Sequence, residues 1–212
     1  MGLTYSDLQI HKNTSAWTTT GGIHVIALQP TLGTVVGQHQ PPAPFYLFEG
    51  DNNANAKYIS RPTPNDGANP GVSTYWECWF RLPDPTAQEL WFIVANQQTI
   101  QVADANIRGY GVYLTNIGGG AAPVVTLYRL TGGGGLVEIG NSGGTMNANT
   151  LYRVRISREV SGANRFWRVY YNDLVTPVFG PTNDATYTNF SYWGWDHLTY
   201  ARMMCGGESC RS

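Results

Sequence analysis

The sequence predicts an all-β protein, a two-sheet antiparallel jelly-roll sandwich. One observation is the segment 151–173, where apolar and polar residues alternate on both sides of a Ser161–Asn164 turn. A second is a succession of roughly ten or more short strand-like segments, with turn residues about every 8–12 positions and no convincing amphipathic helix. A third is size, because 212 residues that are 42% hydrophobic suffice for one substantial core.

The N-terminal part is expected to hold four short strands, at Gly22–Leu28, Thr34–Val36, Phe45–Phe48 and Lys57–Ile59. The last two are expected to pair with each other across a turn. The proline run 41–44 interrupts any ladder, because proline has no amide proton to donate. Residues 61–73 have the composition of a loop.

The segment Tyr75–Leu82 has the strongest strand chemistry in the sequence. Alternation puts Trp76, Cys78 and Phe80 on one face, and the intervening residues on the other. Because both faces carry large aromatic residues, we expect a central strand. The continuous apolar run Trp91–Ala95 is typical of a buried strand, and one helical turn is expected within Thr86–Leu90.

The C-terminal half is expected to complete the sandwich. Strands are expected at Gly109–Thr115, Val124–Leu130, Leu136–Ile139, both arms of the 151–173 hairpin, and Phe190–Tyr200, the last closing the sheet. The glycine cluster at 132–135 is interpreted as a hairpin turn. A phosphate-binding loop is excluded there because no helix follows.

Composition excludes several function classes. The formal net charge is −1 and no basic run is present, which argues against a nucleic-acid partner. No apolar stretch reaches about 18 residues, so membrane insertion is not expected. Charged residues are 13% of the chain, against roughly 25% in a typical soluble domain. That low-charge composition is common in extracellular, cell-surface and virion β-proteins, and we expect such a location here.

The spacing of the three cysteines does not match that of a metal-binding site. Cys205 and Cys210 are close enough in sequence for a local disulfide, and two free thiols are an equally good interpretation. Cys78 is expected to be a small buried apolar residue. The organisation expected from these patterns is an N-terminal arm or extra strands at 1–44, a sandwich at 45–202, and a tail at 203–212.

Six segments carry a family resemblance: FYLFEGDNNANAKYIS, STYWECWFRLPD, RGYGVYL, VTLYRL, NTLYRVRISREVSGANRFWRVYYNDLV and YWGWDHLTYAR. In order and character they resemble the concanavalin A-like lectin/glucanase superfamily, and within it the laminin G-like domains. The resemblance implies a concanavalin A-like sandwich whose curved face often carries a glycan or protein site, sometimes with a calcium ion at the rim.

Catalysis is not favoured. The glucan hydrolases of that superfamily share closely spaced strand acids, E-x-D-x-x-E or E-x-D-x-E, which this sequence lacks. The best acid/base pair is Asp196 with His197. Adjacent strand residues point to opposite faces, however, so the two are not expected to share one task.

Sugar recognition needs flat aromatic faces with polar groups around their edges. The candidate ligand-binding residues are Trp193 and Trp195, which share a face at alternate positions, with Asp196 beside them, and Trp17 in a polar segment. The alternative for each tryptophan is that it fills the core of the sandwich. Asp51, Asn53 and Asp173 are candidate calcium ligands in rim loops, and turn formation by Asn and Asp explains them equally well.

The predicted function is that of a non-catalytic surface recognition or attachment protein with a glycan or cell-surface ligand. No cofactor is expected, and calcium at the rim is the one alternative. The first alternative is a structural protein of a virion or fibre surface that self-associates. The second is a glycan-degrading hydrolase or lyase with an atypical site.

Overall fold

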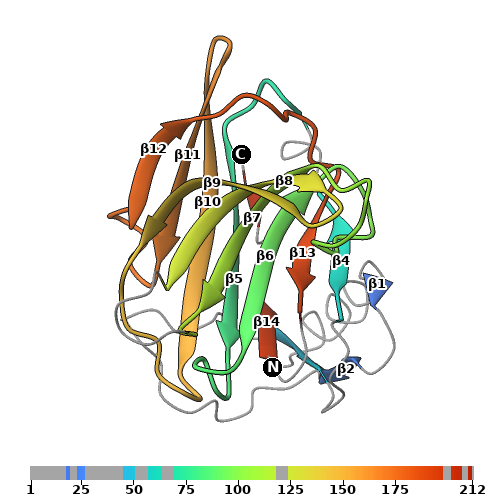
Figure 1. The fold of residues 1–212 in the computed structure, drawn as a ribbon, viewed down its shortest axis with the longest axis vertical. Coiled ribbons are helices and arrows are strands. Elements are labelled where there is room, and N and C mark those ends of the chain that lie inside the picture. Colours follow the sequence, from blue (N-terminus) through green and yellow to red (C-terminus); the bar gives the residue numbers. More distant parts are fainter. Residues whose placement is uncertain are drawn as a thin grey trace, which may run out of the picture.

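The computed structural model describes residues 18–19, 23–26, 45–50, 57–63, 69–117, 124–197, 202–206 and 210–211. These residues form two antiparallel sheets packed face to face, which confirms the all-β sandwich (Figure 1). Within the described ranges, the chain has no helix of a length and hydropathy that would cross a membrane.

The sheet nearer the viewer in Figure 1 is called sheet I. Its strand order is β1-β4-β13-β6-β7-β8-β9. The bounds are β1 Thr18–Thr19, β4 Ile59–Pro62, β13 Tyr192–Asp196, β6 Glu89–Ala95, β7 Gly109–Thr115, β8 Val125–Gly132 and β9 Gly135–Ser142. The strands from β6 to β9 are joined in sequence order, so each pairs with the next one along the chain.

The second layer, sheet II, has the order β12-β11-β10-β5-β14-β3-β2, with β15 also pairing with β5. The bounds are β12 Phe179–Asn183, β11 Asn164–Tyr171, β10 Leu151–Ser161, β5 Thr74–Arg81, β14 Arg202–Gly206, β3 Phe45–Gly50, β2 Ile23–Ile26 and β15 Cys210–Arg211. The predicted hairpin is β10–β11, with Ser161 opposite Asn164. The predicted central strand is β5, which lies between β10 and β14.

The main core lies between the two sheets. Alternate residues of β5, Trp76, Cys78 and Phe80, face it as predicted, and all are buried. Trp76 and Trp167 stack with ring centroids 6.5 Å apart, which ties β5 to β11. Aromatic pairs of this kind add to the free energy gained from burying apolar area.

The topology corrects the expected ends of the sandwich. β3 and β4 do not pair with each other, because β3 belongs to sheet II and β4 to sheet I. β13 is not the closing strand, since it lies between β4 and β6 inside sheet I. Part of the expected tail forms β14, which lies between β5 and β3. Residues 85–87 form a turn with no helix, and Glu89 already begins β6.

A second, smaller apolar cluster covers the outer face of sheet I. It joins Trp91, Ile93 and Ala95 of β6 to apolar residues of the 96–108 loop, which include Ile100 and Val102. The loop folds back over the sheet, so β6 is buried on both faces. This explains the continuous apolar run at Trp91–Ala95 and leaves a hollow beside the loop.

Candidate functional site: an aromatic pocket on the outer face of sheet I

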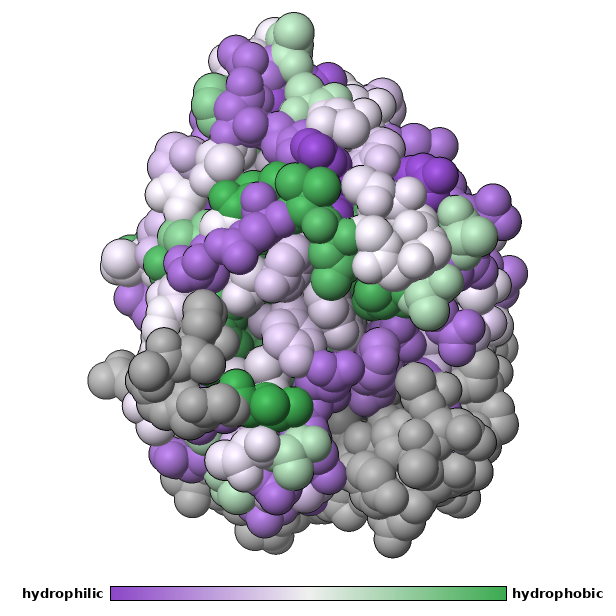
Figure 2. Space-filling view, in the orientation of Figure 1, coloured by the Kyte–Doolittle hydropathy of each residue, from purple (hydrophilic) through white to green (hydrophobic). Residues whose placement is uncertain are grey.

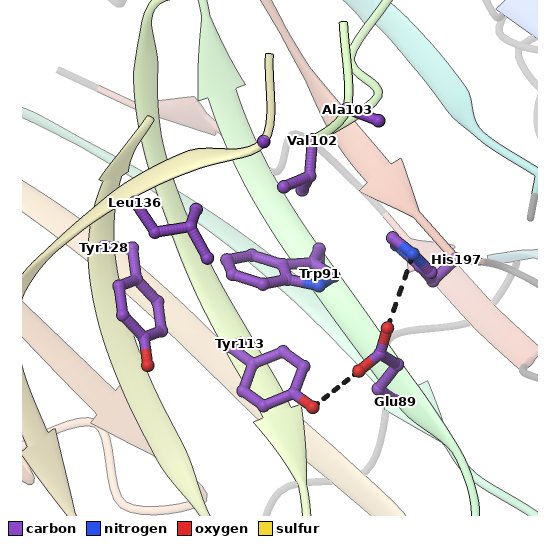
Figure 3. A pocket seen from close by; sticks show the side chains of 9 residues that line it. Glu89, Trp91, Val102, Ala103, Tyr113, Tyr128, Leu136 and His197 are labelled. Carbon is purple, nitrogen blue, oxygen red and sulfur yellow. Dashed lines mark hydrogen bonds and ion pairs between the residues drawn. The ribbon is translucent and has the colours of Figure 1, made fainter. Parts of the chain in front are cut away.

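A pocket of about 440 Å³ lies on the outer face of sheet I, between the 96–108 loop and the β8–β9 turn. Figure 2 shows this side of the molecule, with pale residues of intermediate hydropathy near a hollow and green apolar residues around them. Four strands, one loop, one turn and the residue that follows β13 supply the lining (Figure 3): Glu89, Trp91, Val102, Ala103, Tyr113, Tyr128, Gly134, Leu136 and His197.

The floor of the pocket is aromatic. Trp91 of β6 lies directly opposite Tyr113 of β7, and their ring centroids are 4.7 Å apart. Tyr128 of β8, one strand beyond β7, also approaches Trp91, with ring centroids 5.5 Å apart. The two tyrosines are half-buried and Trp91 is 5% exposed, so a ligand would mainly contact the tyrosine rings.

The close approach of Tyr128 to Trp91 depends on a glycine. Gly111 of β7 lies between Ile93 and Tyr128 in the sheet. A Cβ at position 111 would come within 3.2 Å of Trp91 Cε3 and of Ile93 Cγ1. The missing side chain therefore lets the indole lie across β7.

The loop wall is held in place by hydrogen bonds to two neighbouring elements. The amide of Val102 donates to Asp196 Oδ2 at 2.7 Å. The amides of Gly133 and Gly134 donate to the carbonyls of Asp104 and Val102, at 2.8 and 3.2 Å. These bonds join the loop to β13 on one side and to the β8–β9 turn on the other, so the pocket has fixed walls.

The charged end of the pocket is a row of three ionisable side chains. His197 lies between Glu89 and Asp196, with Nε2 3.3 Å from Glu89 Oε1 and Nδ1 3.2 Å from Asp196 Oδ2. The other oxygen of Glu89 accepts a hydrogen bond from Tyr113 Oη at 2.5 Å. About a third of the Glu89 and His197 side chains is exposed, whereas the Asp196 side chain is 2% exposed. Glu89 and His197 are therefore the charged groups that a ligand can reach.

The backbone explains why Asp196 and His197 meet. They are adjacent, and in a regular strand their side chains would point to opposite faces. The strand ends at Asp196, however, and His197 has a φ of 60°, which turns its ring back to the outer face. The expectation that these two side chains point to opposite faces is wrong for this reason, and they lie in contact.

Burial and nearby carboxylates shift the pKa values of the ionisable side chains in the pocket. Burial of the His197 ring opposes protonation, but Asp196 and Glu89 outweigh it and raise the pKa of His197 above its ordinary 6.5. Burial, with the hydrogen bond to Glu89, raises the pKa of Tyr113 well above its usual range. Burial, with the nearby Glu138 charge, also raises the pKa of Tyr128. Both tyrosines are thus neutral hydroxyl groups near neutral pH.

The predicted tryptophan platform is wrong. Trp193 and Trp195 do share a face, but that face points into the main core, where they are 1% and 0% exposed. They fill the space between the sheets and pack against Phe92. Asp196 lies on the opposite, outer face, opposite Trp91 in the register. Its buried carboxylate supports His197 and the loop from behind the pocket.

The other predicted site residues do not reach this pocket or cannot be placed. Trp17, Asp51 and Asn53 lie outside the described residues. Asp173 is exposed, and its Oδ1 accepts a hydrogen bond from the Val175 amide at 2.8 Å, as expected of a turn. Among the described residues, no three His, Cys, Asp or Glu side chains come together as a metal site would require. Calcium binding by the three rim residues stays a prediction.

The principal pocket residues were not singled out from the sequence. Glu89, Trp91, Tyr113 and Tyr128 all occupy alternate, outward positions of their strands, as the pairing of Trp91 with Tyr113 shows. A usable signal was present in GYGVYLT, where Gly111 and Tyr113 share a face and the absent side chain of the glycine leaves room for the Trp91 ring.

Comparison with known proteins supports the fold. No protein-family model and no curated protein matches the chain. Among solved structures, a carbohydrate-binding module, CBM66 from Bacillus subtilis, is 13% identical and covers 93% of this chain and 96% of its own, with a TM-score of 0.52.

Two further similar structures are carbohydrate-related. The Emp47p carbohydrate recognition domain is 12% identical, with coverage of 91% and 89% and a TM-score of 0.50. The VIP36 exoplasmic/lumenal domain, bound to Ca²⁺ and Man3GlcNAc, is 8% identical, with coverage of 92% and 85% and a TM-score of 0.52. The chain therefore shares the concanavalin A-like β-sandwich fold of these structures.

Proposed function

From the concanavalin A-like fold and the pocket on sheet I, we propose that this protein is a glycan-binding surface recognition or attachment protein. The observation that carries the proposal is the group formed by Trp91, Tyr113 and Tyr128 with the Glu89 carboxylate at its end. The C–H face of a pyranose packs on aromatic rings, and its hydroxyl groups donate to a carboxylate.

The similar structures support this proposal at the level of the fold. CBM66 and the Emp47p domain are described as carbohydrate-binding, and VIP36 was solved with a mannose-containing ligand. The exoplasmic/lumenal origin of the VIP36 domain is consistent with the proposed extracellular, cell-surface or virion location. Self-association and a structural role on a virion or fibre stay predictions.

The test is a glycan array probed with the full chain, followed by calorimetric titration of the strongest oligosaccharide. Tyr128→Ala removes one half-buried ring of the pocket. We expect it to weaken binding tenfold or more, equivalent to about 1.4 kcal/mol. The matched control is Tyr170→Ala, because Tyr170 is also half-buried but stacks on Arg155 of sheet II. Equal affinity of both variants and the wild type would refute the proposed site.

A glycan-degrading enzyme is the second candidate, and one observation favours it. His197 is held between two carboxylates in the pocket, and its raised pKa suits proton transfer to a glycosidic oxygen near neutral pH. The test is release of reducing ends from polysaccharides by the wild type and by His197→Gln. Hydrolysis by the wild type that His197→Gln abolishes would favour the enzyme over the binding protein.

A further inference from the structure

The described lining of the pocket contains a carboxylate but no permanently charged cation. Of its nine lining residues, Glu89 is the acid and His197 is the base, and none is Lys or Arg. The two tyrosines of the floor stay neutral, for the reasons given above. His197 lies between Glu89 and Asp196, so two carboxylates face its single positive charge.

Two carboxylates next to the lining residues add negative charge. Asp196 contacts His197 from the buried side, and Glu138 of β9 lies opposite Tyr128 in the register. The nearby Arg108 donates to the carbonyls of Ala105 and Ile107 and does not line the pocket. The charged side chains around the aromatic floor therefore carry a net negative charge.

The described arginines of the β10–β11 hairpin do not offset this charge. Arg153 and Arg155 both pair with Glu77 across β5 and β10, and they stack on Trp79 and Tyr75. All of these residues belong to sheet II, whereas the pocket is on the outer face of sheet I. The acidic pocket and this cationic cluster are thus on separate layers.

We infer that the pocket is selective for neutral and amino-bearing sugars, that it excludes acidic sugars, and that Glu89 is the specificity-determining residue. This rests on the proposed function. A sugar carboxylate or sulfate would meet the Glu89 carboxylate, and the described lining holds no guanidinium or ammonium to pair with it. A protonated amino group would gain both the carboxylate and the faces of the tyrosine rings.

The experiment compares matched hexose, hexosamine and hexuronate oligosaccharides by calorimetric titration at low salt, where surface charges are least screened. We expect the hexuronate to bind about tenfold or more weakly than the hexose, and the hexosamine to bind most tightly. Glu89→Gln should remove most of the discrimination between the charged sugars. Glu159→Gln is the control, because it deletes the same charge from a surface pair with Arg168 and should leave all three affinities unchanged.

Each failure has a distinct signature. A hexuronate that binds as tightly as the hexose, with binding that still depends on Tyr128, overturns the selectivity but leaves the glycan site standing. Discrimination that Glu89→Gln and Glu159→Gln change equally overturns the role of Glu89, because net charge alone then explains it. No binding by any of the three sugars or by the glycan array overturns the selectivity together with the proposed function.

Discussion

Gly111→Ala tests the construction of the pocket floor. The new methyl group would lie 3.2 Å from both Trp91 Cε3 and Ile93 Cγ1, and 3.6 Å from Leu130 Cδ1. Carbon contacts are optimal at roughly 3.5–4.0 Å, so two of the three neighbours must move by at least about 0.3 Å. Overpacking of this kind costs about 1–3 kcal/mol, and the reduced entropy of the unfolded chain returns about 0.4–1 kcal/mol.

The expected net result is a free energy of unfolding about 1 kcal/mol lower and a Tm about 2–4 °C lower. The indole ring is expected to shift, so tryptophan fluorescence should change and the affinity for the array's strongest oligosaccharide should fall. The assays are urea unfolding and calorimetric titration.

Gly143→Ala is the matched control, because no heavy atom lies within 4 Å of its Cβ position. It should leave stability and affinity unchanged or raise stability slightly. If Gly111→Ala were as stable as Gly143→Ala and bound sugar normally, the proposed packing of the floor would be refuted.

Three further predictions concern the residues around the pocket. The free energy of unfolding should fall as pH rises from about 6.5 through the raised pKa of His197, because the folded state holds that proton more tightly than the unfolded state. Urea unfolding at about pH 5.5 and about pH 8.5 measures this, and a difference of the same size in His197→Gln would contradict it. Asp196→Asn should cost about 1.5–3 kcal/mol and speed hydrogen exchange at the Val102 amide, since the charged acceptor of that amide is lost; unchanged exchange would argue against this anchor. Trp195→Ala should cost about 3–5 kcal/mol in chemical unfolding, while the folded fraction still binds glycan; loss of binding at unchanged stability would restore Trp195 as a ligand contact.

Alternation along single strands was predictable from the sequence. It placed Trp76, Cys78 and Phe80 on one face of β5 and located the β10–β11 hairpin. These features depend on residues close in sequence, and a two-residue period is visible without any knowledge of the neighbouring strands.

For β13, the sequence did not predict which of the two alternating faces points to the core. The period identifies Trp193 and Trp195 as one set and Asp196 as the other, but it does not say which set is buried. The neighbouring strands decide this, because β13 lies between β4 and β6, and Phe92 receives both tryptophan rings. The predicted platform therefore turned out to be core.

The pocket itself depends on long-range register. Trp91 meets Tyr113 only because β6 and β7 pair with a particular offset across the 96–108 loop, and the length of that loop does not determine the offset. The contact of His197 with Asp196 and Glu89 depends on a single positive φ at the end of β13. Neither feature has a local pattern from which it could have been predicted.

The most direct test of glycan binding in the sheet I pocket is a crystal structure of the chain with the strongest neutral oligosaccharide from the array. We expect one sugar ring in van der Waals contact with Tyr113 and Tyr128, with a hydroxyl group donating to Glu89. An ordered sugar bound elsewhere on the sandwich, with the pocket on sheet I empty, would contradict it.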